Sequence, residues 1–322
     1  RRKRALRLMT MSPWSALRTG LSRIWLHKRL VLWLYLCNVA FAGVLLFPFR
    51  NVIGEIGKSD LSHDFVSGFS LDSFIDFGDR HALSFQTLGY AALGLGVAYL
   101  LLYIFLTAGI VTALASDQRV SMRRFLIGAG RTFGRFVRLF VFFLLVMGLL
   151  GVAYSFGLAP RIDAWREAAT TDRAAFLRRA LGVVLLIVAG SLTVMVFDYA
   201  KIRAVVDRRR GMFRTLLAAF AFCLRRSLHV VPLFYLNVLM VGVLFGAYLL
   251  LEGFFSNATT LSLWSLFVLQ QLFVVGRVVA KLSFFSSQLS YYRGVGVPAD
   301  SLSVPVPRAE PEPVPLAPTT AL

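Results

Sequence analysis

The chain has 322 residues, of which 57% are hydrophobic and 29 are phenylalanine. A soluble domain needs polar side chains to cover its surface, so this composition excludes an ordinary soluble protein. The formal net charge of +19 could indicate a nucleic-acid-binding protein. However, the basic residues lie between apolar runs of about 20 residues, the length that crosses a bilayer. The composition therefore predicts an all-α, polytopic integral membrane protein that binds no nucleic acid.

Three regions follow from the distribution of apolar residues along the chain. Residues 1–28 form a basic amphipathic segment, residues 29–293 form a six-helix transmembrane domain, and residues 294–322 form a proline-rich, disordered cytoplasmic tail. We predict spans at about 29–49, 85–115, 136–158, 179–200, 229–251 and 261–285. Pro48 is expected to close the first span and Pro160 to stop the third.

The amino-terminal segment has the signature of a helix that lies in the membrane interface. Ser12 is the predicted N-cap and Pro13 the first helical residue, and Thr171 is a second predicted N-cap before the fourth span. The apolar residues that follow Pro13 fall on one helical face and include two tryptophans: Trp14, Leu17, Leu21, Ile24 and Trp25. Tryptophan beside lipid with arginine toward water is typical of interfacial helices.

Two further basic stretches, 116–135 and 201–227, are amphipathic and lie between spans. Phe213, Leu217, Phe220 and Leu224 share one face of the second stretch. Arginines on such helices attract anionic lipid headgroups by about 1 kcal/mol each. The residues expected to contact anionic lipid or an acidic partner surface are Arg124, Arg131, Arg135, Arg208, Arg209, Arg210 and Arg214.

Lys and Arg alternate strongly between the two sides of the predicted topology. Segments 1–28, 116–138 and 201–226 hold eight, six and eight of them, whereas 50–84, 159–179 and 252–260 hold three, five and none. The positive-inside rule therefore places both termini in the cytoplasm. The first apolar run is too long for a cleaved signal peptide. Arginine-rich, alanine-rich composition indicates a bacterial chain, and hence the inner membrane.

A shift of 90 residues aligns 108–138 with 198–228 and gives seven identities in 31 positions. Each unit consists of an inward span, a basic segment and an outward span, in the same orientation. This pattern is consistent with a parallel internal repeat, although shared composition at membrane edges can produce similar matches. If the duplication is real, the two units should superpose.

Motifs for catalysis and metal binding are missing from the chain. Its four histidines and two cysteines have no metal-ligand spacing, and no phosphate-binding loop or nucleophile motif occurs. Asp72, Asp76 and Asp79 share a helical face in the outer loop, so a divalent cation site is conceivable there. A solvated acidic face is favoured because no calcium-loop pattern accompanies them. We therefore expect no cofactor and no enzymatic activity.

Charged residues inside spans are costly and hence informative. Asp198 lies at the inner end of the fourth span, and Arg277 and Lys281 lie at matching depth in the sixth. An ion pair of Asp198 with either residue could fix helix register, or Asp198 could act as a gating or proton-coupled carboxylate. Gly242 and Gly246 in the fifth span have the spacing that lets two membrane helices pack closely.

The chain resembles a broad group of bacterial six-span membrane proteins, the YciC-like proteins and the membrane domain that precedes some glycerophosphodiester phosphodiesterases. The resemblance covers about residues 12–293 and rests on topology and three short stretches. These are Arg29-Leu30-Val31-Leu32-Trp33-Leu34-Tyr35, Gly68-Phe69-Ser70-Leu71-Asp72 and Asp198-Tyr199-Ala200-x-x-Arg203. It implies an α-helical membrane fold, and it implies no phosphodiesterase activity because that domain is missing here.

From these patterns we expect a scaffold, assembly or accessory subunit whose partners are anionic lipids and other membrane proteins. The alternative is a transporter or lipid-handling protein. Charged residues and the glutamines Gln270 and Gln271 facing a continuous polar cavity would favour transport. A sealed interior with exposed small-residue faces, such as that of Gly242 and Gly246, would favour a partner subunit.

Overall fold

A computed structural model describes residues 12–26, 28–56, 75, 82–116, 121–207, 211–255 and 260–295. Within these residues every regular element is a helix, and six helical stretches are long and apolar enough to cross a membrane. The elements are α2 (Pro13–Leu26), α3 (Lys28–Ile56), α6 (Ala82–Ala115), α7 (Met122–Val152), η1 (Ala153–Leu158), α8 (Ala159–Glu167), α9 (Asp172–Val206), α10 (Met212–Arg225), α11 (Ser227–Glu252) and α12 (Thr260–Gly294). The predicted all-α, six-span fold class is confirmed.

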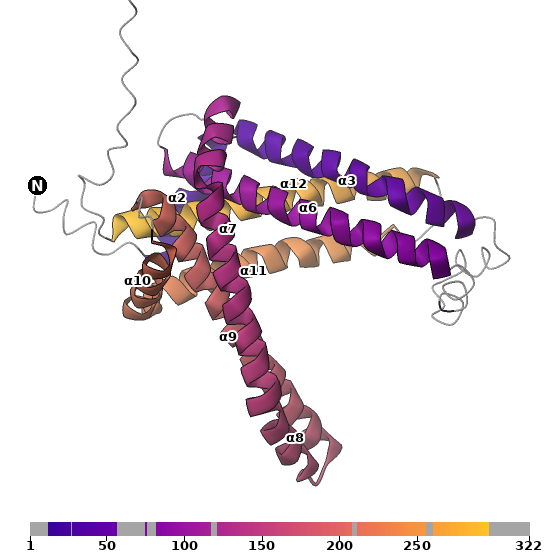
Figure 1. The fold of residues 1–322 in the computed structure, drawn as a ribbon, viewed down its shortest axis with the longest axis vertical. Coiled ribbons are helices and arrows are strands. Elements are labelled where there is room, and N and C mark those ends of the chain that lie inside the picture. Colours follow the sequence, from indigo (N-terminus) through magenta and orange to yellow (C-terminus); the bar gives the residue numbers. More distant parts are fainter. Residues whose placement is uncertain are drawn as a thin grey trace, which may run out of the picture.

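The helices form two arms that meet in a hub (Figure 1). The first arm contains α3, α6, α11 and α12, and the second contains α7, α8 and α9, which run in a different direction. Buried residues concentrate where the arms meet, so we define the hub as α2, α10 and the segments 104–114, 122–139, 195–207, 226–237 and 278–295. The described arginines of α2, of the start of α7 and of α10 lie at this hub.

Both N-caps expected from the sequence are present. Ser12 Oγ accepts a hydrogen bond from the Ser15 amide at 3.2 Å, and α2 begins at Pro13. Thr171 Oγ1 accepts from the Ala174 amide at 3.3 Å and starts α9. Each cap satisfies a backbone donor that the first helical turn leaves unpaired.

Neither proline ends a helix. Pro48 was expected to close the first span, and the apolar stretch of α3 that is long enough to cross a membrane, Lys28–Pro48, does end there. The prediction that Pro160 stops the third span is wrong. Pro48 lies inside α3, which continues to Ile56. Pro160 lies in the first turn of α8, directly after the π-helical turn η1, so the helical path from Met122 to Glu167 is unbroken. The wider π turn changes the backbone hydrogen bonding just before the proline ring, which lets the chain remain helical.

The two units of the proposed repeat agree at one end and differ at the other. α6 ends at Ala115 and α7 starts at Met122, whereas α9 ends at Val206 and α10 starts at Met212. After the 90-residue shift these boundaries coincide to within one residue. The second unit then breaks at Arg226 (φ −121°, ψ 23°), while α7 continues without interruption. Residues 122–135 of the first basic segment are therefore the start of a long helix, and duplication stays a prediction.

The amino-terminal helix α2 packs on α12 instead of lying free in the interface. A Cβ added to Gly20 would lie only 2.7 Å from the backbone nitrogen of Ser287, so the backbones of the two helices are in direct contact at this glycine. Leu17 and Ile24 are buried, but Trp25 is 81% exposed. The apolar face predicted for this helix thus splits into a side docked on the hub and a tryptophan side open to lipid.

Candidate functional site

The intramembrane carboxylate Asp198 is buried in α9 and forms an ion pair within its own helix. Lys201 Nζ donates to Asp198 Oδ1 at 2.8 Å. The predicted pairing with Arg277 or Lys281 is therefore wrong, since neither residue lies within ion-pair distance of Asp198. A lysine one turn away on the same helix can reach the carboxylate whatever the spacing between helices.

The lysines of this region lie over aromatic rings. Lys281 Nζ is 3.7 Å from the centroid of the Tyr103 ring, and Lys201 Nζ is 5.9 Å from that of Phe285. A desolvated cation–π contact contributes about 2 kcal/mol. We call Asp198, Lys201, Lys281 and these two rings the charged cluster; it joins α6, α9 and α12 and has two lysines for one carboxylate. Arg277 lies outside it, on the exposed side of α12.

A second polar group closes the carboxyl ends of α9 and α12 and was missed by the sequence analysis. Arg203 binds Asp207 Oδ2 through Nε at 3.1 Å, and Tyr292 donates to Asp207 Oδ1 at 3.2 Å. Arg203 also donates to the carbonyl of Ala218 in α10 at 2.8 Å. Because Asp207 follows Arg203 by four residues, the pair itself was detectable, but its link to Tyr292 depends on the fold.

Other polar side chains connect α12 to its neighbours. Asn237 of α11 donates to Ser287 Oγ at 3.1 Å, and Tyr35 of α3 donates to Gln271 at 2.8 Å. Gln270 is exposed. The amide of Gln288 is fully buried and has no hydrogen-bond partner among the described residues. Gln270 and Gln271 were the candidates to line a transport cavity. Gln271 instead forms a contact between helices, and Gln270 is exposed.

The basic residues expected to meet anionic lipid divide into three groups. Arg124, Arg131 and Arg214 are exposed on α7 and α10. Arg135 instead turns inward and donates to the carbonyl of Ala204 at 3.4 Å, because the end of α9 leaves that acceptor available. Residues 208–210 lie outside the described residues, as do the acidic outer loop and its aspartates.

Helix α10 has two apolar faces with different surroundings. Met212, Thr215, Ala219 and Cys223 are buried against the hub, and burial raises the pKa of the Cys223 thiol to about 12. The face predicted from the sequence, which contains Phe213, Leu217, Phe220 and Leu224, is exposed. An exposed apolar face flanked by arginines is typical of a helix that lies in the membrane interface.

The predicted packing glycines Gly242 and Gly246 face open space. No atom of a neighbouring element lies within 4 Å of a Cβ built on either one. They therefore mediate no helix packing among the described residues. Close packing depends on other glycines, among them Gly20, Gly109, Gly128 and Gly276.

Among the described residues, no group of three or more His, Cys, Asp or Glu could hold a metal ion. Comparisons with protein-family models, curated proteins and solved structures found no match for this chain. Its sequence and structure together indicate a multi-pass integral membrane protein whose buried polar side chains lie mostly in the hub.

Proposed function

We propose that this protein is a non-enzymatic scaffold, assembly or accessory subunit of a membrane complex, resident in the cytoplasmic membrane with its hub toward the cytoplasm. The observation that carries the proposal is the open glycine face of α11, formed by Gly242 and Gly246. The orientation rests on the described arginines of α2, of the start of α7 and of α10 at the hub, in agreement with the positive-inside rule.

Several close contacts between helices of this chain occur at glycine residues. A Cβ on Gly128 of α7 would lie 2.8 Å from Thr112 of α6, and one on Gly276 of α12 would lie 3.0 Å from Leu244 of α11. Small residues let membrane helices approach closely, and this approach is a principal source of helix association in lipid.

The same residue type appears at a four-residue spacing on faces that meet no other element in the described part of the chain. Gly242 and Gly246 on α11 form one such face, and Gly130 and Gly134 on α7 form another. A glycine inside a helix costs about 0.5–1 kcal/mol relative to alanine. Contact with a helix of another membrane protein would offset that cost, which supports the accessory-subunit function.

The test is native mass spectrometry of the full chain extracted gently from its own membrane, together with two variants. In Gly242→Leu/Gly246→Leu the open face of α11 is filled, and in Gly43→Leu an isolated open glycine on α3 is filled as the control. We expect a stoichiometric membrane-protein partner with the native chain and the control, and its loss from the double variant. A chain found alone, bound only to a second copy of itself, or retaining the partner in the double variant would contradict the proposal.

The charged cluster favours a second candidate, a transporter or lipid-handling protein. Buried charges in spans often mark transport or proton pathways, and this cluster has two lysines, Lys201 and Lys281, for the one carboxylate of Asp198. An uptake or lipid-exchange activity that Asp198→Asn abolishes while the variant stays folded would support this candidate. Unfolding of the variant would support a structural ion pair instead.

A further inference from the structure

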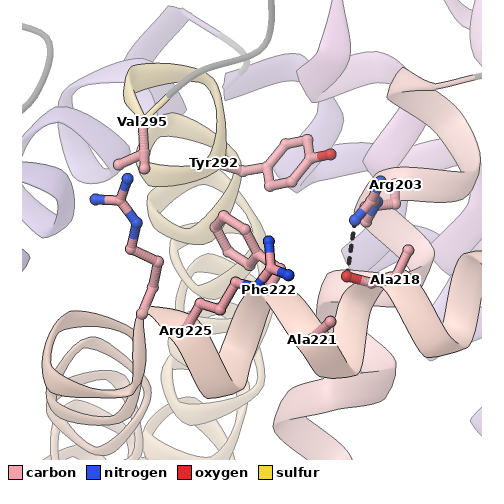
Figure 2. Close-up of a pocket in the computed structure, with 8 residues that line it drawn as sticks. Arg203, Ala218, Ala221, Phe222, Arg225, Tyr292 and Val295 are labelled. Atoms are coloured by element: carbon pink, nitrogen blue, oxygen red, sulfur yellow. Dashed lines mark hydrogen bonds between the residues drawn. The ribbon is translucent and has the colours of Figure 1, made fainter.

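A pocket of about 430 Å³ lies in the hub, where α9, α10, α11 and α12 meet (Figure 2). This volume is within the range of small-molecule sites, about 300–1,000 Å³. Three arginines line it, Arg203, Arg225 and Arg226. Figure 2 shows the rings of Phe222 and Tyr292 near the middle of the view, with Arg203 beside Ala218.

The pocket is positively charged, because only one of its arginines is neutralised. Arg203 Nη2 lies 3.0 Å from Asp207 and is held in place by that pair. None of the described residues forms an ion pair with Arg225 or Arg226. Two guanidinium groups without an acid partner suit a phosphate group, whose oxygens match the planar fork of arginine.

The pocket lies at the ends of three candidate spans. Arg203 is in the last turn of α9, Arg226 directly precedes α11, and Tyr292 is in the last turn of α12. The ends of membrane helices lie at the level of the lipid headgroups. A phosphate at this depth belongs to a phospholipid more naturally than to a solute that enters from the aqueous phase.

Helix α10 gives a lipid access to the pocket from the side. Ala221 and Phe222 line the pocket, while Phe213, Leu217 and Phe220 of the same helix are exposed. Acyl chains can cover this exposed face while the headgroup reaches the arginines. We infer that the pocket binds the phosphodiester headgroup of an anionic phospholipid, held by Arg225 and Arg226 against the rings of Phe222 and Tyr292. This site does not depend on the accessory-subunit proposal.

The experiment is a titration of the full chain in neutral detergent with phosphatidylglycerol, with bound lipid counted by native mass spectrometry. Phosphatidylcholine serves as the neutral-headgroup probe and inorganic phosphate as the soluble one. Arg225→Gln/Arg226→Gln removes the two unpaired pocket charges. The control, Arg123→Gln/Arg138→Gln, removes two exposed charges of α7 outside the pocket. Ala221→Trp fills the pocket and leaves the net charge unchanged.

We expect phosphatidylglycerol to bind the native chain and the control alike, and in preference to phosphatidylcholine. The double pocket variant should weaken binding about thirtyfold, from about 1 kcal/mol for each arginine at about 1.4 kcal/mol per tenfold change. Ala221→Trp should weaken it as well, which a diffuse surface charge would not do. Equal binding of the two lipids, equal loss in the control, or saturation by inorganic phosphate without preference for phosphatidylglycerol would overturn the inference.

Discussion

The hub and the two arms are made of similarly apolar helices, yet they differ in how they are held together. In the hub, Gly20 and Gly128 lie against neighbouring helices, and the ion pair of Asp198 with Lys201 is part-buried. The arms also contain close glycine contacts, at Gly182 and Gly276, but Gly43 and Gly94 have no neighbours within 4 Å of their Cβ positions, and the large apolar side chains of the arms are mostly exposed.

This difference follows from the solvent that each region meets. Lipid tails are as apolar as leucine, so exposed apolar side chains in the arms cost nothing and do not drive the helices together. At the hub the helix ends carry unpaired backbone groups and charges, which require specific partners. We therefore expect the stability of the folded chain to depend on hub residues and to tolerate equivalent changes in the arms.

The sharpest test of the comparison removes one acid from an ion pair in each region. Asp198→Asn leaves Lys201 without its carboxylate, and breaking a buried pair in this way costs about 3 kcal/mol. We place the loss at the low end because the Lys201 side chain is 26% exposed and can reach toward water. Asp163→Asn breaks the exposed pair with Arg166 in α8 and should cost less than about 0.5 kcal/mol.

Thermal unfolding in mild detergent measures both variants against the native chain. The double variant Asp198→Asn/Lys201→Met should recover most of the lost stability, because no uncompensated charge then remains. Equal midpoints for Asp198→Asn and Asp163→Asn would show that the hub pair is no more important than the arm pair, and would remove the basis of the comparison.

A smaller effect is expected from adding one methyl group to a glycine in each region. Gly20→Ala places a Cβ 2.7 Å from the Ser287 backbone, which cannot rotate away, so we expect a loss of about 2 kcal/mol. Gly43→Ala meets nothing and should leave the chain unchanged or more stable by about 0.5 kcal/mol. Hydrogen exchange of residues 13–26 should accelerate in the first variant only. Unchanged exchange there would mean that α2 does not depend on this contact.

The parts of the fold that could be predicted from sequence are those set by local composition. Apolar runs between basic segments predict six spans, and Ser12 and Thr171 predict helix starts, because each signal is contained within one stretch of chain. The amphipathic face of α10 was predictable for the same reason, since its helical period places Phe213, Leu217 and Phe220 together.

Pairings between elements were not predictable in this way. Depth in the membrane suggested Arg277 or Lys281 for Asp198, but depth does not determine rotation about the helix axis, and Lys201 was closer. The spacing of Gly242 and Gly246 identifies a small-residue face without showing whether a helix of the same chain covers it. Pro160 was expected to end the third span, but the helix continues through it after the π turn η1. That turn depends on backbone geometry, which composition does not encode.

The smallest expected effect compares two tyrosine hydroxyl groups. Tyr292→Phe removes the hydrogen bond to Asp207 in the hub and should cost about 1 kcal/mol, since Arg203 still neutralises the carboxylate. Tyr99→Phe removes the 3.3 Å contact with Asn38 between α6 and α3 in the first arm, and should cost about 0.6 kcal/mol, the average for such bonds in membranes. Thermal unfolding of both variants beside Asp198→Asn measures the order of effects. If Tyr292→Phe proved the most damaging of the three, the polar group of Arg203, Asp207 and Tyr292 would determine hub stability. The charged cluster around Asp198 would then be free to serve binding or transport.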